Sequence, residues 1–282
     1  MKKFVVLFHG ECWDGFGGGY AAWKKFGNKA EYYPLKHGGD LPKDLKGRQI
    51  YLIDFSFQES AMKKLVEDNY VVALDHHVSA EKTVKMADEW VYALKNSGAV
   101  IAWNYFHPHK PVPKLLRHIQ DVDLWNWKLP RTAELMAYMG LVEYDFKIWD
   151  KIARDWENPK KLKFYIDRGQ YILKYENQMV GRLLEAAEVA KFENYKTLVV
   201  NSPVLHSEVG NRLTEMLPPI AIVWSEKNGI RRVSLRSNGK VDVAKLAEKY
   251  GGGGHKAAAG FSVSLKKPVP WKIIKPSFDG KK

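Results

Sequence analysis

The sequence contains one cysteine, Cys12, among its 282 residues. No disulfide can form within the chain, which excludes the small secreted folds that depend on disulfide bridges. Long hydrophobic runs are also absent. The apolar stretch 4–8 is too short for the core of a secretory signal, and no stretch approaches the roughly 20 apolar residues of a membrane span. We therefore expect a cytoplasmic protein with no membrane partner.

Acidic residues are in the minority, since 32 Asp and Glu face 45 Lys and Arg and the formal net charge is +13. This charge favours anionic partners such as oligonucleotides or polyphosphate, although it also serves solubility. A hydrophobic content of 45% and a charged content of 27% are typical of a folded globular protein. The length allows two modest domains, each with its own core.

Short apolar runs alternate with helical stretches over the first 125 residues, which predicts an α/β fold with a mainly parallel sheet flanked by helices. The runs 4–8, 50–54 and 71–74 are almost continuously apolar, as strands buried on both faces should be. A glycine-rich turn over 15–19 is expected to separate the first strand from a helix. Further helices are expected over 59–67, 97–105, 114–120 and 143–155.

The second half of the chain predicts a smaller α/β unit. The stretch 161–191 has helical composition and is long enough to connect two domains. Strands are expected at 198–201, 220–224, 231–237 and 261–265, with helices at 207–217 and 242–250. The tail from Lys266 onward is expected to be a surface strap or a frayed end. The predicted domains are 1–160, a helical connector 161–192, and 193–282.

Polar residues follow each of the three apolar runs of the first domain: His9, Asp54 and Asp75. Ligands of open α/β sheets bind outside the carboxyl ends of the strands, so these side chains are expected to converge there. Asp14, five residues after His9, can face the same cation. The plainer alternatives are that His9 is a satisfied polar residue in a tight turn and that Asp54 caps a helix.

The segment Asp75-His76-His77 points most directly to a metal site. Successive side chains of an extended segment alternate in direction, so all three cannot bind one ion. We expect one histidine to ligate a metal or touch substrate, while Asp75 ligates or orients an imidazole. Mixed carboxylate and imidazole ligands suit Mn²⁺ better than the thiolate sets that favour zinc.

A glycine run, 251–254, precedes His255. Backbone N–H groups without side chains allow close approach of an anion, and His255 can donate to a phosphate oxygen. Arg236 offers a planar fork for the same purpose. The alternatives are a hinge for the glycines and a surface role for Arg236. A phosphate cradle and a metal site in one chain together predict metal-assisted cleavage of a phosphate ester.

The segment Asp75-His76-His77, the His…Cys-x-Asp-Gly start, the Asp-x-Asp-Leu-Trp segment 121–125 and the glycine-histidine loop resemble the DHH phosphoesterase superfamily with its DHH-associated C-terminal domain. The resemblance runs from His9 to Phe261 and is strongest to the oligoribonuclease and exopolyphosphatase-like branch. It implies a manganese-dependent exonuclease that hydrolyses short RNA or DNA oligonucleotides. The active site would lie between two domains, and two metal ions would activate a bridging hydroxide. Mg²⁺ or Co²⁺ are alternative ions. Alternative substrates are polyphosphate, 3′-phosphonucleotides and linear or cyclic dinucleotides, and a non-catalytic nucleic-acid binder is a lesser alternative.

The resemblance also implies roles for particular residues. His9 would hold one metal ion and Asp14 the second, with Asp54 between them. The second ion's ligands would be completed by His76 and Asp121, with Asp123 as the alternative to Asp121. Asp75 and His77 would be catalytic, with His77 facing the substrate phosphate. Substrate would be bound by the following residues: Arg236, Gly252, Gly253, Gly254 and His255.

The chain departs from the family pattern at Cys12, where many relatives carry an aspartate. The Cys12 thiolate, the neighbouring Glu11 or a water molecule would fill that place. The sequence leaves the oligomeric state open.

Overall fold

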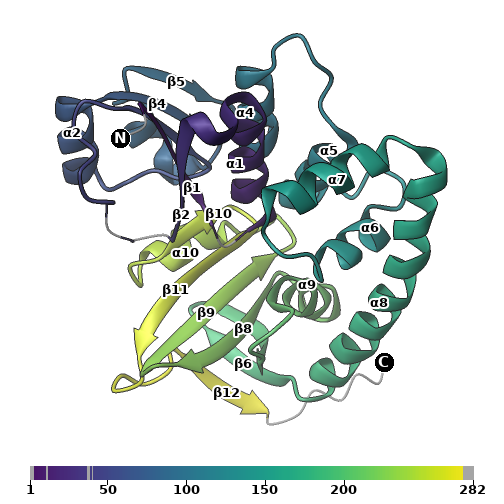
Figure 1. The fold of residues 1–282 in the computed structure, drawn as a ribbon. Helices are drawn as coiled ribbons and strands as arrows, with labels where there is room; N and C mark the ends of the chain where they lie inside the picture. The colour runs from purple at the N-terminus through teal and green to yellow at the C-terminus, as the bar shows by residue number, and fades with distance from the viewer. Residues whose placement is uncertain (1–2, 11, 37–38, 40, 276–282) are drawn as a thin grey trace. The chain divides into compact units, whose positions relative to one another are not determined.

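The computed structural model describes residues 3–10, 12–36, 39 and 41–275. The chain divides into two compact units, Met1–Leu173 and Lys174–Lys282, and each is built on its own sheet (Figure 1). The division falls within the long helix α8 (Pro159–Glu185), which leads from one unit into the other. Among the described residues, no helix combines the length and apolar character needed to cross a membrane.

The first unit contains a five-stranded, fully parallel sheet in the order β2-β1-β3-β4-β5. The predicted apolar runs are confirmed as β1 (Phe4–His9), β3 (Gln49–Ile53) and β4 (Tyr70–Asp75). Two edge strands, β2 (Ala30–Leu35) and β5 (Glu89–Tyr92), were not predicted. Glu31 and Pro34 interrupt the apolar pattern of β2, and the apolar residues of β5 are mostly exposed at the edge of the sheet.

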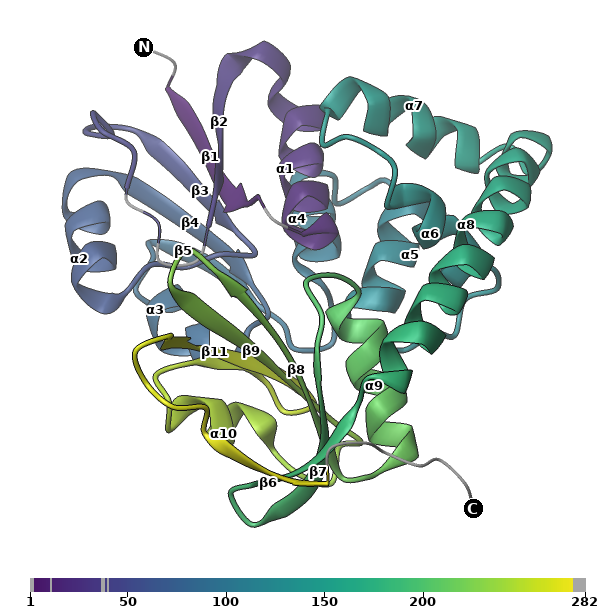
Figure 2. The same ribbon diagram turned by 90° about the horizontal axis from the view of Figure 1, so that it is seen from below.

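Helices cover both faces of this sheet (Figures 1 and 2). On one face α1 (Trp13–Phe26) and α4 (Gly98–Phe106) pack against alternate strand residues such as Val6 and Phe8. On the other face α2 (Glu59–Asp68) and α3 (Glu81–Val84) pack against the intervening residues, such as Leu7. Short 3-10 turns lie at Gly27–Lys29 and Val78–Ala80. Burial on both faces explains why the central strands contain almost no polar residue.

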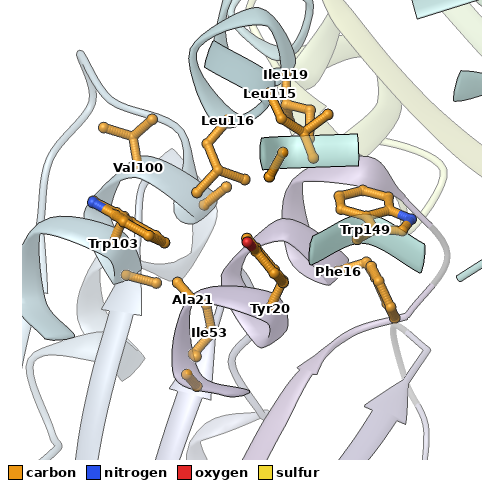
Figure 3. Close-up of a cluster of buried hydrophobic side chains, with 14 of the residues drawn as sticks. Phe16, Tyr20, Ala21, Ile53, Val100, Trp103, Leu115, Leu116, Ile119 and Trp149 are labelled. Carbon is orange, nitrogen blue, oxygen red and sulfur yellow. The ribbon is translucent and has the colours of Figure 1, made fainter. Parts of the chain in front are cut away.

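A helical layer extends the first core beyond α1. It consists of α5 (Lys114–Asp123), α6 (Thr132–Met139) and α7 (Phe146–Trp156). Figure 3 shows side chains of α1, α4, α5 and α7 gathered in this buried cluster. The labelled members are Phe16, Tyr20, Ala21, Ile53, Val100, Trp103, Leu115, Leu116, Ile119 and Trp149. The cluster fixes α1, and therefore the residues at its N-terminus.

The glycine-rich segment 15–19 is not the turn that the sequence predicts, because it lies inside α1. A Cβ on Gly18 would meet Ile53 Cγ2 at 2.3 Å, and one on Gly19 would meet the Phe8 ring at 3.0 Å. Glycine is unfavourable in a helix by about 1 kcal/mol relative to alanine. Here the missing side chains let the helix lie directly on β1 and β3, and the packing offsets that cost.

The second unit contains a seven-stranded sheet in the order β10-β11-β9-β8-β7-β6-β12, antiparallel except for the β7–β8 pair. Helix α9 (His206–Met216) covers one face and α10 (Val243–Glu248) the other. The strands are β6 (Glu188–Phe192), β7 (Tyr195–Asn201), β8 (Ile220–Lys227), β9 (Ile230–Ser237), β10 (Gly253–His255), β11 (Ala258–Ser264) and β12 (Trp271–Lys275).

Two predictions for this unit are wrong. The predicted connecting helix does not continue to residue 191, because Glu188–Phe192 form β6. The predicted strap contains β12, which pairs antiparallel with β6 and buries Trp271. Both strands are short and carry lysines, so their pattern lacks the apolar run used to identify strands. Residues 276–282 of the predicted tail lie outside the described part of the chain.

Candidate metal centre

Three neighbouring strands bring titratable side chains to one edge of the first sheet. His9 ends β1, Asp75 ends β4, and Asp54 directly follows β3, which lies between them. Because the strands are parallel, their carboxyl ends meet at the same edge. The N-terminus of α1 and the C-terminus of α5 supply further groups, so five separate segments contribute to the site.

The first cluster consists of His9, Cys12 and Asp54. His9 Nδ1 lies 3.1 Å from Cys12 Sγ and 3.7 Å from Asp54 Oδ2. Cys12 Sγ lies 3.4 Å from the same Asp54 oxygen. Glu11, the other residue considered for this place, lies outside the described residues. An imidazole, a thiol and a carboxylate therefore face one common point.

The second cluster consists of Asp14, His76 and Asp123. His76 Nε2 lies 3.7 Å from Asp14 Oδ2 and 3.5 Å from Asp123 Oδ2. It also lies 3.2 Å from Asp54 Oδ1. Asp54 thus turns one carboxylate oxygen toward each cluster, which is the arrangement that a ligand shared by two ions requires.

The backbone of Asp54 lies in the left-handed region, with φ +54°, and its N–H donates to Leu74 O at 2.9 Å. Aspartate and asparagine adopt this conformation at lower cost than most residues. The turn ends β3 and directs the carboxylate between the two clusters, where its side chain is 2% exposed. The predicted alternative, an N-cap, does not apply, since α2 begins only at Glu59.

Asp14 is held by the first residues of α4. Its two carboxylate oxygens accept the N–H groups of Gly98 at 2.6 Å and Ala99 at 3.0 Å. The N-terminus of a helix favours a carboxylate, because its N–H groups carry partial positive charge. The sequence offered no signal for this long-range contact between two segments 84 residues apart.

Asp75 orients His77. Its Oδ1 lies 2.7 Å from His77 Nδ1 and also accepts the backbone N–H groups of His76 and His77, at 2.6 and 3.0 Å. His77 Nδ1 is in turn 3.6 Å from Asp54 Oδ1. The two adjacent histidines therefore differ: His76 belongs to the second cluster, and His77 lies against Asp75.

Asp121, predicted as a metal ligand, lies away from these clusters. Its oxygens accept the N–H groups of Lys128 and Leu129 and the hydroxyl of Thr132, at 2.7–3.0 Å. Asp123, named in the sequence analysis as the alternative, occupies the place beside His76. Residues two apart on a helix point in nearly opposite directions, so only one of the two aspartates can face the site.

The electrostatics of the site are dominated by buried carboxylates. Burial and the neighbouring Asp123 and Asp54 carboxylates raise the pKa of Asp14 well above its usual range. Burial also raises the pKa of Asp123, to about 6. Burial opposes ionisation of Asp54, but the His76 and His9 imidazoles outweigh it and hold the pKa of Asp54 well below its usual range.

The neighbouring carboxylates also shift the pKa values of His77 and Cys12. Burial acts to lower the pKa of His77, but Asp75 and Asp54 outweigh it and raise that pKa to about 9. Burial, with Asp54 and Asp14, raises the pKa of the Cys12 thiol. The site therefore concentrates negative charge that a cation would stabilise.

The glycine loop of the second unit differs from the predicted open cradle. The N–H groups of Gly251 and Gly252 donate to Glu248 O and Ala247 O, each at 3.0 Å, and so close the end of α10. Gly253–His255 form β10, which pairs with β11. A Cβ on Gly252 would meet Gly260 O at 2.1 Å, and Gly254 has φ +141°. Gly252 and Gly254 are therefore required by the backbone, and the N–H of Gly252 is not available to a ligand.

Arg236 lies in β9, and its guanidinium reaches the start of α9. It donates to Ser207 Oγ at 2.8 Å and to Leu235 O at 2.9 Å. Gly210 of α9 makes room for it, because a Cβ there would lie 2.7 Å from Arg236 Cγ. Burial lowers the pKa of Arg236, while Glu208 acts to raise it. The predicted planar fork is thus held in place by α9 rather than lying on an exposed surface.

Comparison with known proteins agrees with these observations. Residues 200–270 match the DHHA1 domain. An uncharacterized protein of Acanthamoeba polyphaga mimivirus is 33% identical over 298 residues, covering 96% of this chain and 70% of that protein. Oligoribonuclease NrnB of Bacillus subtilis (strain 168) is 26% identical over 181 residues, covering 59% of this chain and 43% of that protein. The chain belongs to the DHH superfamily of phosphoesterases.

Solved structures share the fold of this DHH phosphoesterase. The pGpG-specific phosphodiesterase PggH from Vibrio cholerae superposes with a TM-score of 0.51 at 12% identity, covering 94% of each chain. RecJ from Thermus thermophilus, in complex with Mn²⁺, gives a TM-score of 0.51 at 16% identity, covering 94% of this chain and 50% of RecJ. These likenesses establish the α/β architecture of the DHH protein.

The residues present in this DHH phosphoesterase fit divalent metal ions. Asp54 Oδ1 and Asp75 Oδ2 are buried and accept no hydrogen bond from any residue that the structure describes. Leaving buried carboxylate oxygens without donors is costly unless a cation pairs with them. Oxygen and imidazole donors suit ions such as Mg²⁺ and Mn²⁺. In the first unit, the described side chains that can hold metal are His9, Cys12, Asp14, Asp54, Asp75, His76, His77 and Asp123.

Proposed function

We propose that this DHH phosphoesterase is a manganese-dependent phosphodiesterase that hydrolyses short oligonucleotides to mononucleotides. The observation that supports it most is the position of Asp54, whose two oxygens face two separate groups of buried ligands. The overall charge of +13 favours a polyanionic substrate, and a relative in Bacillus subtilis is an oligoribonuclease.

Two sets of side chains would hold the ions: His9 and Asp54 for one, and Asp14, Asp54, His76 and Asp123 for the other. Bound divalent ions supply a Lewis acid for the phosphoryl oxygens and a water of lowered pKa. Gly98 and Ala99 keep the Asp14 carboxylate in place. Asp75 fixes the ring of His77, to which we assign the substrate phosphate as hydrogen-bond partner.

A pair of exposed tryptophans supports a substrate that carries bases. Trp125 and Trp127 follow Asp123 by two and four residues, and they are 42% and 40% exposed. Both have positive φ, +53° and +51°, which is costly for a bulky side chain. Their loop is held by Asp121, whose carbonyl accepts the Asn126 N–H at 2.8 Å. Exposed indoles a few residues from Asp123 offer stacking surfaces for nucleotide bases, which polyphosphate does not have.

The function is tested by assaying the protein with Mn²⁺ on RNA of two to five nucleotides, polyphosphate and cyclic dinucleotides in parallel. We expect mononucleotides from the short RNAs, no turnover after chelation of metal, and recovery when Mn²⁺ is added back. If only an unrelated phosphomonoester is consumed, the oligonucleotide assignment is wrong and membership of the superfamily still holds.

Replacing Trp125 or Trp127 by alanine is expected to raise KM for a dinucleotide about tenfold, because stacking of one base contributes roughly 1–3 kcal/mol. Inhibition by inorganic phosphate, which has no base, should not change. Trp90→Ala is the matched control, since Trp90 is 45% exposed on β5 of the same unit. Equal KM values in all three variants would remove the tryptophans from substrate recognition.

Arg236→Lys is expected to raise KM about tenfold with kcat changed only a few-fold. Lysine keeps the charge but loses the planar fork that binds phosphate through two donors. Arg232→Lys is the control, because Arg232 lies four residues earlier on the same strand and is exposed. An unchanged KM in Arg236→Lys would contradict the expectation that Arg236 binds the substrate phosphate.

A further inference from the structure

The donor atoms of the first cluster form a compact triangle. The three edges measure 3.1 Å from Cys12 Sγ to His9 Nδ1, 3.4 Å from Sγ to Asp54 Oδ2, and 3.7 Å from His9 Nδ1 to that oxygen. Ligand atoms at metal–ligand distances of 2.0–2.3 Å are separated by about 3.0 Å at an octahedral right angle and about 3.6 Å at the tetrahedral angle. All three edges fall in or near this range, so sulfur, nitrogen and oxygen can reach one ion together.

The backbone directs Cys12 Sγ toward His9 and Asp54. Cys12 is the N-cap residue of α1, with φ −136° and ψ 160°, and Sγ accepts the N–H of Gly15 at 3.2 Å. Capping by itself does not favour cysteine, since serine, threonine, aspartate and asparagine cap better and sulfur is a weak acceptor. Gly15 also lets the start of α1 lie close against β1, since any larger residue would place its Cβ 2.1 Å from His9 O. Cys12 and His9 are therefore held together by the helix–strand junction itself.

Asp54 joins this triangle to the second cluster, and its carboxylate is a second sign that a cation belongs between the two. Its Oδ2 faces Cys12 and His9, while its buried Oδ1 accepts no hydrogen bond from any described residue. The left-handed turn after β3 directs the carboxylate to this point, and Cys12 Sγ donates to its Oδ2 at 3.4 Å. A thiol, an imidazole and an under-coordinated carboxylate at these distances are a donor set for a metal ion.

We infer that the Cys12 thiolate is a direct ligand of the first metal ion, together with His9 and Asp54. Coordination replaces the thiol proton, which leaves to solvent. A sulfur ligand in place of an oxygen shifts the preference of this position from Mn²⁺ toward softer or borderline ions such as Co²⁺, Zn²⁺ and Cd²⁺. The inference rests on the metal-dependent function proposed above and adds the chemical nature of one of its two ion positions.

The inference is tested with Co²⁺ on the 282-residue chain. Cys12 is the only cysteine of the chain, so a thiolate-to-cobalt charge-transfer band in the near ultraviolet can arise only from this residue. We expect the band in the parent protein and its loss in Cys12→Ser and Cys12→Asp. Both variants retain a capping side chain for α1, and an unchanged melting temperature verifies that they fold. Bound cobalt and manganese are quantified in the same samples.

The possible outcomes separate the two proposals. Cobalt bound by the parent without a charge-transfer band overturns sulfur ligation and leaves the metal-dependent function standing. A parent protein that binds neither cobalt nor manganese overturns the metal-dependent function, and the inference with it. A band that persists in Cys12→Ser also overturns the inference.

A second measurement uses metal preference. In Cys12→Asp, Cd²⁺ affinity is expected to fall at least about tenfold relative to Mn²⁺ affinity, because a hard oxygen replaces a soft sulfur. Slowed alkylation of Cys12 by iodoacetamide in the presence of Cd²⁺ is expected in the parent. An unchanged Cd²⁺ to Mn²⁺ affinity ratio in Cys12→Asp contradicts ligation by the sulfur.

Discussion

Asp54→Asn is expected to lower kcat by about 10³-fold or more, with the fold intact. The variant removes the charged oxygens that face both ligand clusters, and the stabilisation of developing charge at such a site is worth at least this factor. Asparagine adopts the left-handed backbone of position 54, at φ +54°, as readily as aspartate does. The measurement is single-turnover cleavage of a dinucleotide with saturating Mn²⁺, together with the melting temperature of each protein.

Asp44→Asn is the matched control for this experiment. Asp44 also has a left-handed backbone, with φ +61°, but its side chain is exposed and it belongs to none of the metal-ligand clusters found among the described residues. We expect its rate to equal that of the parent. A rate within a few-fold of the parent in Asp54→Asn would mean that the catalytic centre lies elsewhere.

Gly98→Ala is expected to reduce kcat by about 10²-fold without removing any functional group. A Cβ at position 98 would lie 2.6 Å from Asp54 Cβ and 3.0 Å from Asp14 Oδ2, so both carboxylates must move. A displacement of about 1 Å at a catalytic site costs on the order of 10²-fold in rate, and such overpacking destabilises by about 1–3 kcal/mol. Steady-state kinetics and denaturant unfolding measure the two effects.

Gly181→Ala is the control, because Gly181 lies within α8 and a Cβ there meets nothing within 4 Å. Alanine in a helix is more favourable than glycine, so we expect about 0.5–1 kcal/mol of added stability and unchanged turnover. Full activity in Gly98→Ala would show that the positions of Asp14 and Asp54 tolerate a shift, which would contradict a rigid carboxylate cluster.

The central strands, and the gathering of three polar residues at one edge of their sheet, could be predicted because the signals are local. The runs that became β1, β3 and β4 are apolar throughout, since both faces of the sheet are covered. Each is followed by a polar residue, and parallel strand ends meet at one edge whatever the details of packing. The sequence pattern alone therefore predicts that His9, Asp54 and Asp75 lie at the same edge of the sheet.

Other features could not be predicted because they depend on contacts distant in sequence. The edge strands β2 and β5 and the added strand β12 are short and are stabilised by pairing with a neighbouring strand that lies elsewhere in the sequence. The glycines of α1 have the composition of a turn, and only the close approach of Gly18 to Ile53 and of Gly19 to Phe8 explains them within a helix. Asp121 and Asp123 have the same chemistry, and only the direction of α5 decides which one faces His76.

The sequence by itself determined the α/β class, the metal-competent residue types and the edge of the sheet at which they gather, because strand periodicity and strand order along the chain are local properties. Tertiary structure alone decided which ligand atoms lie close enough together to bind one metal ion. It placed Asp54 between two clusters, gave Asp14 its partners on α4, turned Asp121 toward the loop 128–132, and set Cys12 Sγ against His9. The physical reason is that ligand geometry requires positions accurate to a fraction of an ångström, and only the packing of α1, α4 and α5 on the sheet supplies that accuracy.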